Sequence, residues 1–126
     1  MKCEIGDIVL VKDFKYPDGR DGTLHYFVVI DVEQDELAIF PLDEYLGFIV
    51  SSKKEKETYP YNIPIKKDEI NRLQKDSHVK CDYIYEGIKE DDVLMKLGMV
   101  TQEQYDEFID CYEKSKQEAA AAKEPE

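Results

Sequence analysis

The sequence has few of the residues that mark a metal site, a disulfide framework or a membrane segment. Its three cysteines, Cys3, Cys81 and Cys111, are widely spaced and form no CxxC pair. We therefore predict neither a zinc site nor a dithiol redox motif, and we expect free thiols that are mostly buried. No apolar run approaches the length of a membrane span, and the N-terminus lacks the apolar core of a signal peptide. These absences favour a cytoplasmic protein without a metal or another cofactor.

Basic residues are much scarcer than acidic residues. The chain has 29 aspartates and glutamates against 17 lysines and arginines, which gives a net charge of −12. Only two residues, Arg20 and Arg72, are arginines. A charge of this size repels a nucleic-acid backbone at long range, so nucleic-acid binding would require a local basic patch. Two other interpretations are that the acidic surface faces a basic partner and that it only keeps the protein in solution.

The chain of 126 residues is long enough for one domain with its own core, and it begins with two short apolar runs. Residues 8–11 (IVLV) and 26–30 (YFVVI) are rich in β-branched and aromatic side chains, and a Pro-Asp-Gly turn sequence lies between them at 17–19. This pattern predicts an antiparallel hairpin with a long loop at its tip and a bend at residues 6–7. The second run is dense enough to be buried on both faces.

Later segments alternate between strand and helix patterns. The further expected strands cover residues 37–42, 48–50, 59–65 and 77–86. The strand at 59–65 is expected at an edge of the sheet, because Pro60 and Pro64 cannot donate a hydrogen bond to a neighbour. Residues 66–75 carry apolar side chains at helical spacing, which predicts a short helix. We expect residues 43–47 to form a loop or one helical turn, and residues 93–100 to form an apolar connector under the sheet.

The C-terminal part has the pattern of a helix with a defined start. Thr101 and Gln104 have the spacing of a capping box, in which each side chain bonds to the backbone N–H of the other residue. An apolar stripe at i, i+3, i+4 and i+7 follows at Tyr105, Phe108, Ile109 and Tyr112. Residues 114–126 are charged and alanine-rich, so we expect a frayed or disordered tail after a domain that spans residues 1–113. The whole order of elements predicts an α+β fold that is mainly β: a small, strongly curved antiparallel sheet or open barrel with a short helix and a C-terminal helix.

Several segments, in this order, resemble the MazF/PemK toxins of bacterial toxin–antitoxin systems. They are the opening GDIVLV with its following loop and apolar strand, Ser51-Ser52 with the YPYNIPI segment, DSHVKCDYIYEGI at residues 76–88, and residues 96–109. The resemblance covers most of residues 5–112 and depends on the order and spacing of these segments. It implies an SH3-like barrel that forms a homodimer, pairs with an antitoxin, and cuts single-stranded RNA without a metal.

The resemblance also implies a site. The family carries an arginine, usually before a proline, at the start of the second strand, and His25-Tyr26 stands at that position here. Ser51 matches the family's hydroxyl at the end of the third strand, although a second register places Asp43 there. Cleavage by the 2′-hydroxyl needs a proton acceptor, a proton donor and a cation for the phosphate. The residues expected to be catalytic are Arg20, His25 and Ser51, and those expected to bind substrate are Lys15, Ser52, Lys53 and Lys54.

These residues also have structural interpretations. His25 would make a local hydrogen bond at the start of a strand, Arg20 would pair with Asp18 and Asp21, and the serines would only begin a loop. The altered arginine–proline pair and the acidic charge favour a second function, a catalytically inactive member that binds a basic protein or an antitoxin. Its binding surface would be formed by the acidic clusters at residues 31–36, 43–44 and 90–92. A third hypothesis is an accessory domain without an activity of its own.

Overall fold

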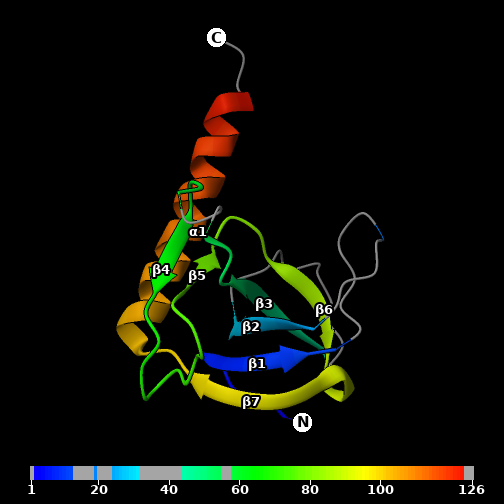
Figure 1. The fold of residues 1–126 in the computed structure, drawn as a ribbon. Helices are drawn as coiled ribbons and strands as arrows, with labels where there is room; N and C mark the ends of the chain where they lie inside the picture. Colours follow the sequence, from blue (N-terminus) through cyan, green and yellow to red (C-terminus); the bar gives the residue numbers. More distant parts are fainter. Residues whose placement is uncertain (1, 13–18, 20–23, 32–43, 55–57, 124–126) are drawn as a thin grey trace.

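The computed structural model describes residues 2–12, 19, 24–31, 44–54 and 58–123. The elements, in chain order, are β1 (Asp7–Val11), β2 (His25–Ile30), β3 (Glu44–Ser51), β4 (Asn62–Ile65), β5 (Ser77–Lys80), β6 (Tyr85–Lys89), the 3₁₀ helix η2 (Glu90–Asp92), β7 (Val93–Met99) and α1 (Gln102–Lys123) (Figure 1). Within these residues, no helix combines the length and the apolar character needed to cross a membrane. The strand expected at residues 37–42 lies outside the described residues.

The described strands form one antiparallel sheet in the order β4-β5-β3-β2-β1-β7, and β6 also pairs with β3. β5 and β6 share one edge of β3, because β5 pairs with Val50 and Ser51 while β6 pairs with the first part of β3, from Glu44 to Gly47. The order begins with β4 and ends with β7, and these two strands do not pair, so the described sheet is not closed into a barrel. The predicted α+β class with an antiparallel sheet and a C-terminal helix is therefore confirmed.

The hairpin of β1 and β2 is confirmed, and both of its strands are buried on two faces. Val9 pairs with Phe27 and Ile8 pairs with Val28, and all four side chains are fully buried. Successive residues of a strand point to opposite faces, so the sheet separates two cores. The bend before β1 is also present: Gly6 has φ +91°, a conformation that favours glycine, and its N–H donates to the Val29 carbonyl (2.7 Å).

The first core lies between the sheet and α1. It contains Ile8, Val28, Ile30, Leu46, Phe48, Val50, Ile65, Leu73, Val79, Cys81, Val100 and Phe108. Phe108 is the buried anchor of α1, and the other predicted stripe residues of the helix pack against the same core. The predicted apolar stripe is therefore confirmed. Figure 1 shows α1 beside β4 and β5, at the opposite end of the strand order from β7.

The second core lies on the other face of the sheet. It contains Val9, Val11, Phe27, Val29, Ile49, Tyr85, Ile88 and Val93, with Cys3 and Tyr45 packed against it. The rings of Phe27 and Tyr85 meet edge to face with centroids 5.6 Å apart. Gly47 in β3 makes room for Ile88 and Phe27, because a Cβ there would lie 2.9 Å from Ile88 Cδ1 and 3.2 Å from Phe27 Cβ.

The start of α1 is the predicted capping box. The Thr101 N–H donates to Gln104 Oε1 (3.0 Å), and the Gln104 N–H donates to Thr101 Oγ1 (3.1 Å). The helix continues to Lys123, although the sequence pattern predicted a frayed or disordered tail at residues 114–126. Side chains after Tyr112 do find contacts: Ser115 is buried and donates to the Tyr112 carbonyl (2.7 Å), and Glu118 accepts a hydrogen bond from the Tyr61 hydroxyl. Packing against the chain before β4 therefore extends the helix past its apolar stripe.

The short helix predicted at residues 66–75 is wrong, because a side-chain-bonded turn takes its place. Asp68 Oδ1 accepts hydrogen bonds from the N–H groups of Ile70 and Asn71, at 2.9 and 2.7 Å. The fully buried Asn71 in turn accepts from the N–H groups of Asp68 and Leu73 through Oδ1, both at 3.0 Å. These local side-chain bonds compete with helical backbone bonds and fix the turn.

Three other predicted boundaries need correction. In the segment 93–100, which was expected to be a connector, residues Val93–Met99 form the edge strand β7, and β7 pairs with β1. Residues 44–47 belong to β3 rather than to a loop or helical turn. The strand expected at 77–86 divides into β5 and the start of β6. The edge position predicted for the strand around Pro64 is confirmed, although β4 begins only at Asn62.

Candidate functional site

A cleft of about 310 Å³ lies where β2 begins and β3 ends. Its lining includes His25, Ser51, Ser52, Lys53, Lys75 and Ser77. Of these residues, His25, Ser51, Ser52 and Lys53 were predicted from the sequence to belong to the site. Lys54 is exposed directly after Lys53, whereas Lys15, Arg20 and Asp43 lie outside the described residues.

The strand register places His25 next to Ser51. Tyr26 of β2 pairs with Val50 of β3, and one step beyond this pair in the antiparallel register His25, which precedes Tyr26, stands across from Ser51, which follows Val50. Because side chains alternate along a strand, these two point to the face of the second core, like Phe27 and Ile49. Both residues are half-buried and line the cleft, together with Val50 and Leu73 of the first core. The alternative residue Asp43 precedes the opposite end of β3.

The Ser51 hydroxyl also shapes the segment that follows β3. Its Oγ accepts a hydrogen bond from the Lys53 N–H (3.2 Å), which holds the first turn of the chain after the strand. A hydroxyl that accepts one bond still has a hydrogen to donate, so Ser51 remains able to bind a phosphate oxygen. The structural and the functional interpretations of Ser51 are therefore compatible.

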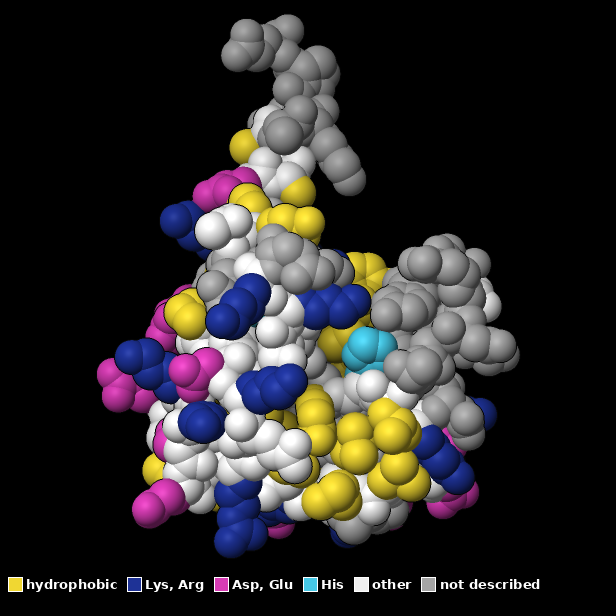
Figure 2. All heavy atoms as spheres, viewed as in Figure 1, with side chains coloured by type: hydrophobic (Ala, Val, Ile, Leu, Met, Phe, Trp, Pro, Cys, Tyr) yellow, Lys and Arg dark blue, Asp and Glu magenta, His cyan; other side chains and the backbone are white. Residues whose placement is uncertain are grey.

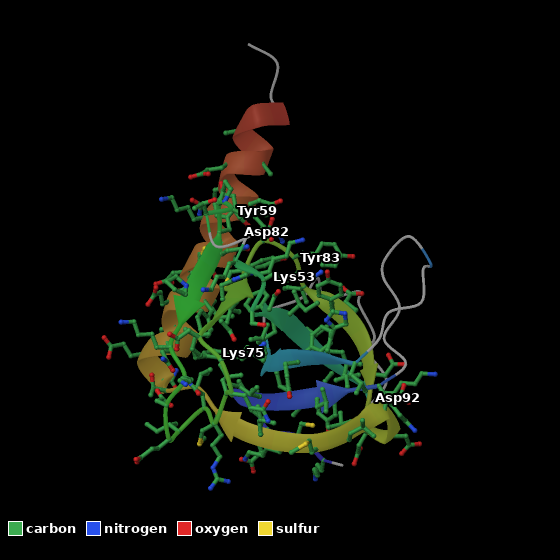
Figure 3. All side chains as sticks on the ribbon, in the orientation of Figure 1. Lys53, Tyr59, Lys75, Asp82, Tyr83 and Asp92 are labelled. Carbon is green, nitrogen blue, oxygen red and sulfur yellow. The ribbon has the colours of Figure 1, made fainter. Side chains whose placement is uncertain are left out.

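Two lysines bring positive charge to the cleft from different segments. Lys53 follows β3, and Lys75 lies shortly before β5; both are labelled in Figure 3. Figure 2 shows this face, where several basic side chains and a histidine surround a hollow and most of the visible acidic side chains lie toward one margin. The cleft thus has the local basic patch that a chain of net charge −12 would need to bind a phosphate backbone.

Lys75, Ser77 and His78 were not among the predicted site residues. Lys75 reaches the cleft because the turn at residues 69–71 leads into β5, and β5 lies along the end of β3. His78 pairs with Ser51 across the β3–β5 ladder and is buried. The sequence offered no local signal for these neighbours, because they depend on pairing between strands far apart in the chain.

A second cavity, of about 250 Å³, lies at the opposite end of the β2–β3 pair. Its walls are mostly apolar and include Cys3, Val29 and Leu46, and its charged residues are Asp31 and Glu44. The Tyr45 hydroxyl in this cavity accepts a hydrogen bond from the Cys3 N–H (3.0 Å). Burial, together with the Asp7 carboxylate, raises the pKa of the Cys3 thiol, which keeps it protonated and unreactive at neutral pH.

The cysteines are free thiols, as predicted, although only Cys81 is buried and Cys3 and Cys111 are partly exposed. Burial raises the pKa of Cys81 and of Cys111, so neither has the thiolate character of a nucleophile. Among the residues that the structure describes, no three His, Cys, Asp or Glu side chains gather in a way that would hold a metal ion.

Comparison with known proteins adds no relative. No protein-family model matches the chain, and a search of curated proteins finds no match.

Proposed function

We propose that this chain binds single-stranded RNA in the cleft between the start of β2 and the end of β3 and cleaves it without a metal. The observation that carries the proposal is the juxtaposition of His25 and Ser51 in a cleft that also contains Lys53 and Lys75. An imidazole, a hydroxyl and two ammonium groups supply a proton acceptor, a hydrogen-bond donor and countercharge for a phosphate. These are the groups that 2′-hydroxyl attack on a phosphodiester requires.

In the proposed reaction, His25 removes the proton from the 2′-hydroxyl as its oxygen attacks the adjacent phosphorus. The bond to the 5′-oxygen breaks, and that oxygen takes a proton from water in the open cleft. The products are a 2′,3′-cyclic phosphate and a free 5′-hydroxyl. Ser51 donates a hydrogen bond to a phosphate oxygen, and the lysines stabilise the charge that increases in the transition state. Lysine lacks the bidentate geometry of arginine, so we expect slower cleavage than an arginine would give unless Arg20 enters the site.

The proposal extends to the MazF/PemK-like role that the sequence segments suggest. On that basis the protein would be the toxin of a toxin–antitoxin pair and would act as a homodimer. The strand order from β1 to β3 and the ordered segments from residue 5 to residue 112 support this proposal.

The test is incubation of the purified protein with a long mixed-sequence single-stranded RNA in the presence of EDTA. We expect cuts at defined positions with 2′,3′-cyclic phosphate ends. His25→Ala should lower the rate by about 10²- to 10⁴-fold, the usual contribution of a general base. Glu44→Gln, at the opposite end of the β2–β3 pair, is the matched control and should cleave normally. A wild-type protein that leaves RNA intact, or a His25→Ala protein that cleaves it normally, would overturn the proposed catalysis.

A second candidate function is supported by the second cavity. Its apolar walls and the carboxylates of Asp31 and Glu44 suit a basic, partly apolar segment of a protein or antitoxin. Binding of such a partner should weaken as salt is added and should be lost in Asp31→Asn/Glu44→Gln, with His25→Ala unaffected. Salt-independent binding would contradict this function.

A further inference from the structure

Three aromatic rings lead from the second core to the surface beside the cleft. Phe27 is fully buried, Tyr85 is 8% exposed and Tyr83 is 42% exposed. The Phe27 and Tyr85 rings meet at 5.6 Å with an interplanar angle of 69°, and those of Tyr85 and Tyr83 meet at 4.7 Å with an angle of 65°. Both are edge-to-face contacts, which aromatic pairs prefer. The exposed ring of Tyr83 is therefore held in place by a buried support.

This series of rings lies on the same face of the sheet as His25 and Ser51. Phe27 is two residues from His25 along β2, so both side chains point to one face. Tyr85 pairs with Gly47, and Gly47 and Ser51 lie on the same face of β3. Tyr83, whose ring contacts Tyr85, therefore stands at the surface on this face rather than on the helix-covered side.

In the view of Figure 3, the labelled Tyr83 lies close to Lys53, and Lys53 lines the cleft. An exposed aromatic ring near a lysine is the combination that single-strand binding proteins use, with a base on the ring and a phosphate on the cation. Asp82 is exposed beside Tyr83 and would repel a phosphate, so the backbone of a bound strand is expected on the Lys53 side. Because its support is already ordered, Tyr83 loses little conformational entropy when a base stacks on it.

We infer that Tyr83 is a stacking site for an unpaired nucleobase of an RNA strand whose phosphates lie along Lys53 and enter the cleft. The inference rests on the proposed function, and it specifies the substrate further: the strand must present an unstacked base near the scissile phosphate. An RNA that is fully base-paired there cannot use the site. Tyr83 is thus a positioning residue that favours single-stranded over double-stranded RNA.

The test measures binding separately from cleavage. The probe is a 2′-O-methylated single-stranded RNA, which lacks the attacking hydroxyl, with 2-aminopurine placed at successive positions. We expect fluorescence quenching at one position on binding by the wild-type protein, and loss of that quenching in Tyr83→Ala. Its affinity should fall by roughly 5- to 150-fold, the range for one stacked base. Tyr83→Phe keeps the ring and should bind within about twofold of the wild type.

The matched control is Tyr59→Ala. Tyr59 is even more exposed, at 53%, but it lies in the turn before β4, and Figure 3 places it nearer to α1 than Tyr83. We expect this variant to bind RNA like the wild type. Circular dichroism and thermal unfolding of each variant separate a folding defect from a binding defect, and Tyr83→Phe keeps the test valid if Tyr83→Ala unfolds.

The outcomes distinguish the two proposals. Binding that depends on Tyr83 without cleavage of unmodified RNA would support the stacking site and overturn the catalytic role of the cleft. Cleavage with wild-type binding in Tyr83→Ala would overturn the stacking site alone. A protein that neither binds the probe nor cleaves unmodified RNA would overturn both.

Discussion

The two ends of the β2–β3 pair differ in charge and in polarity, although the strands between them are apolar. At one end, His25, Ser51 and Lys53 line a cleft whose walls combine polar and basic side chains with apolar ones. At the other end, Asp31 and Glu44 lie beside a cavity with mostly apolar walls. The net charge of −12 therefore does not describe the local charge of the surface that a ligand contacts. Where charges of each sign gather decides which end can hold a phosphate and which can hold a basic group.

Reversing the charges at each end should give the largest difference. Lys53→Glu/Lys75→Glu places two carboxylates in the cleft, so its affinity for single-stranded RNA should fall by at least about tenfold. Asp31→Lys/Glu44→Lys makes the net charge of the protein more positive, which favours RNA binding, but the changed residues lie at the far cavity. Filter binding at one fixed salt concentration measures both. If the RNA affinity of the cleft variant fell no more than its change in net charge predicts, the position of the charges would not matter. That result would contradict the proposed difference between the two ends.

Removing the Ser51 hydroxyl should lower both the rate of RNA cleavage and the stability of the fold, and the two effects can be measured separately. Ser51→Ala loses the donor to the phosphate and the acceptor of the Lys53 N–H, so we expect about a tenfold slower cleavage and about 1 kcal/mol less stability. Initial rates on a defined RNA and urea unfolding measure the two effects. Ser77→Ala, which removes a hydroxyl that donates to the Lys75 carbonyl at the same cleft, is the control for a general change in the loops. Equal cleavage in Ser51→Ala and the wild type would remove Ser51 from the mechanism.

The far cavity can be weakened without touching the cleft. Tyr45→Phe removes the acceptor of the Cys3 N–H, which should lower the free energy of unfolding by about 1 kcal/mol, the usual net worth of one hydrogen bond. RNA cleavage per folded molecule should stay at the wild-type level. Tyr59→Phe, which alters an exposed turn residue, serves as the control for loss of a tyrosine hydroxyl. A drop in cleavage in Tyr45→Phe alone would mean that the two ends are coupled.

Replacing one lysine of the cleft should change the salt dependence of RNA binding by the small amount expected for one phosphate contact. Lys53→Met removes one phosphate contact, so the slope of log K against log salt should become less steep by about one. Lys67→Met, at an exposed lysine that does not line the cleft, should leave the slope unchanged. Binding titrations at four or more salt concentrations give both slopes. An unchanged slope in Lys53→Met would place the phosphates elsewhere.

The smallest expected effect concerns the ion pair that holds the start of β1, next to the far cavity. The Lys96 ammonium lies 2.9 Å from the buried Asp7 carboxylate, whose other oxygen accepts from the Glu4 N–H (2.8 Å). The hydrogen bond to Asp7 raises the pKa of Lys96 above its ordinary value of 10.5. The pair therefore contributes fully below pH 10.5 and is lost as the pH rises through the raised pKa.

Unfolding in urea across pH 9 to 12 tests this expectation, with Lys96→Met as the comparison. The difference in stability between wild type and variant should shrink in this range. A difference that stays constant up to pH 12 would show that the pair does not contribute as described.

The elements that the sequence predicted well are those with a local cause. The β1–β2 hairpin followed from two β-branched runs, and the start of α1 followed from Thr101 and Gln104, whose side chains make the expected bonds. The predicted juxtaposition of His25 and Ser51 came from the resemblance, and the register of β2 and β3 brings them together.

The errors occurred where contacts distant in sequence decide the structure. The apolar content of residues 93–99 does not alternate, yet pairing with β1 makes them a strand. Asn71 satisfies its buried side chain through bonds across its own turn, which overrides the helical spacing of its apolar neighbours. Lys75 lines the cleft because β5 pairs with the end of β3, and Tyr83 contacts Tyr85 at the start of β6; no local pattern specifies either placement.

The most direct test of the difference between the two ends is the position of a bound RNA. We would titrate isotope-labelled protein with a 2′-O-methylated single-stranded RNA and follow backbone and histidine ring resonances by NMR. The largest shifts are expected at His25, Ser51 and Lys53, with small shifts at Asp31 and Glu44. Saturation with the largest shifts at Asp31 and Glu44, or with none in the cleft, would contradict the proposal that the cleft is the RNA-binding end of the protein.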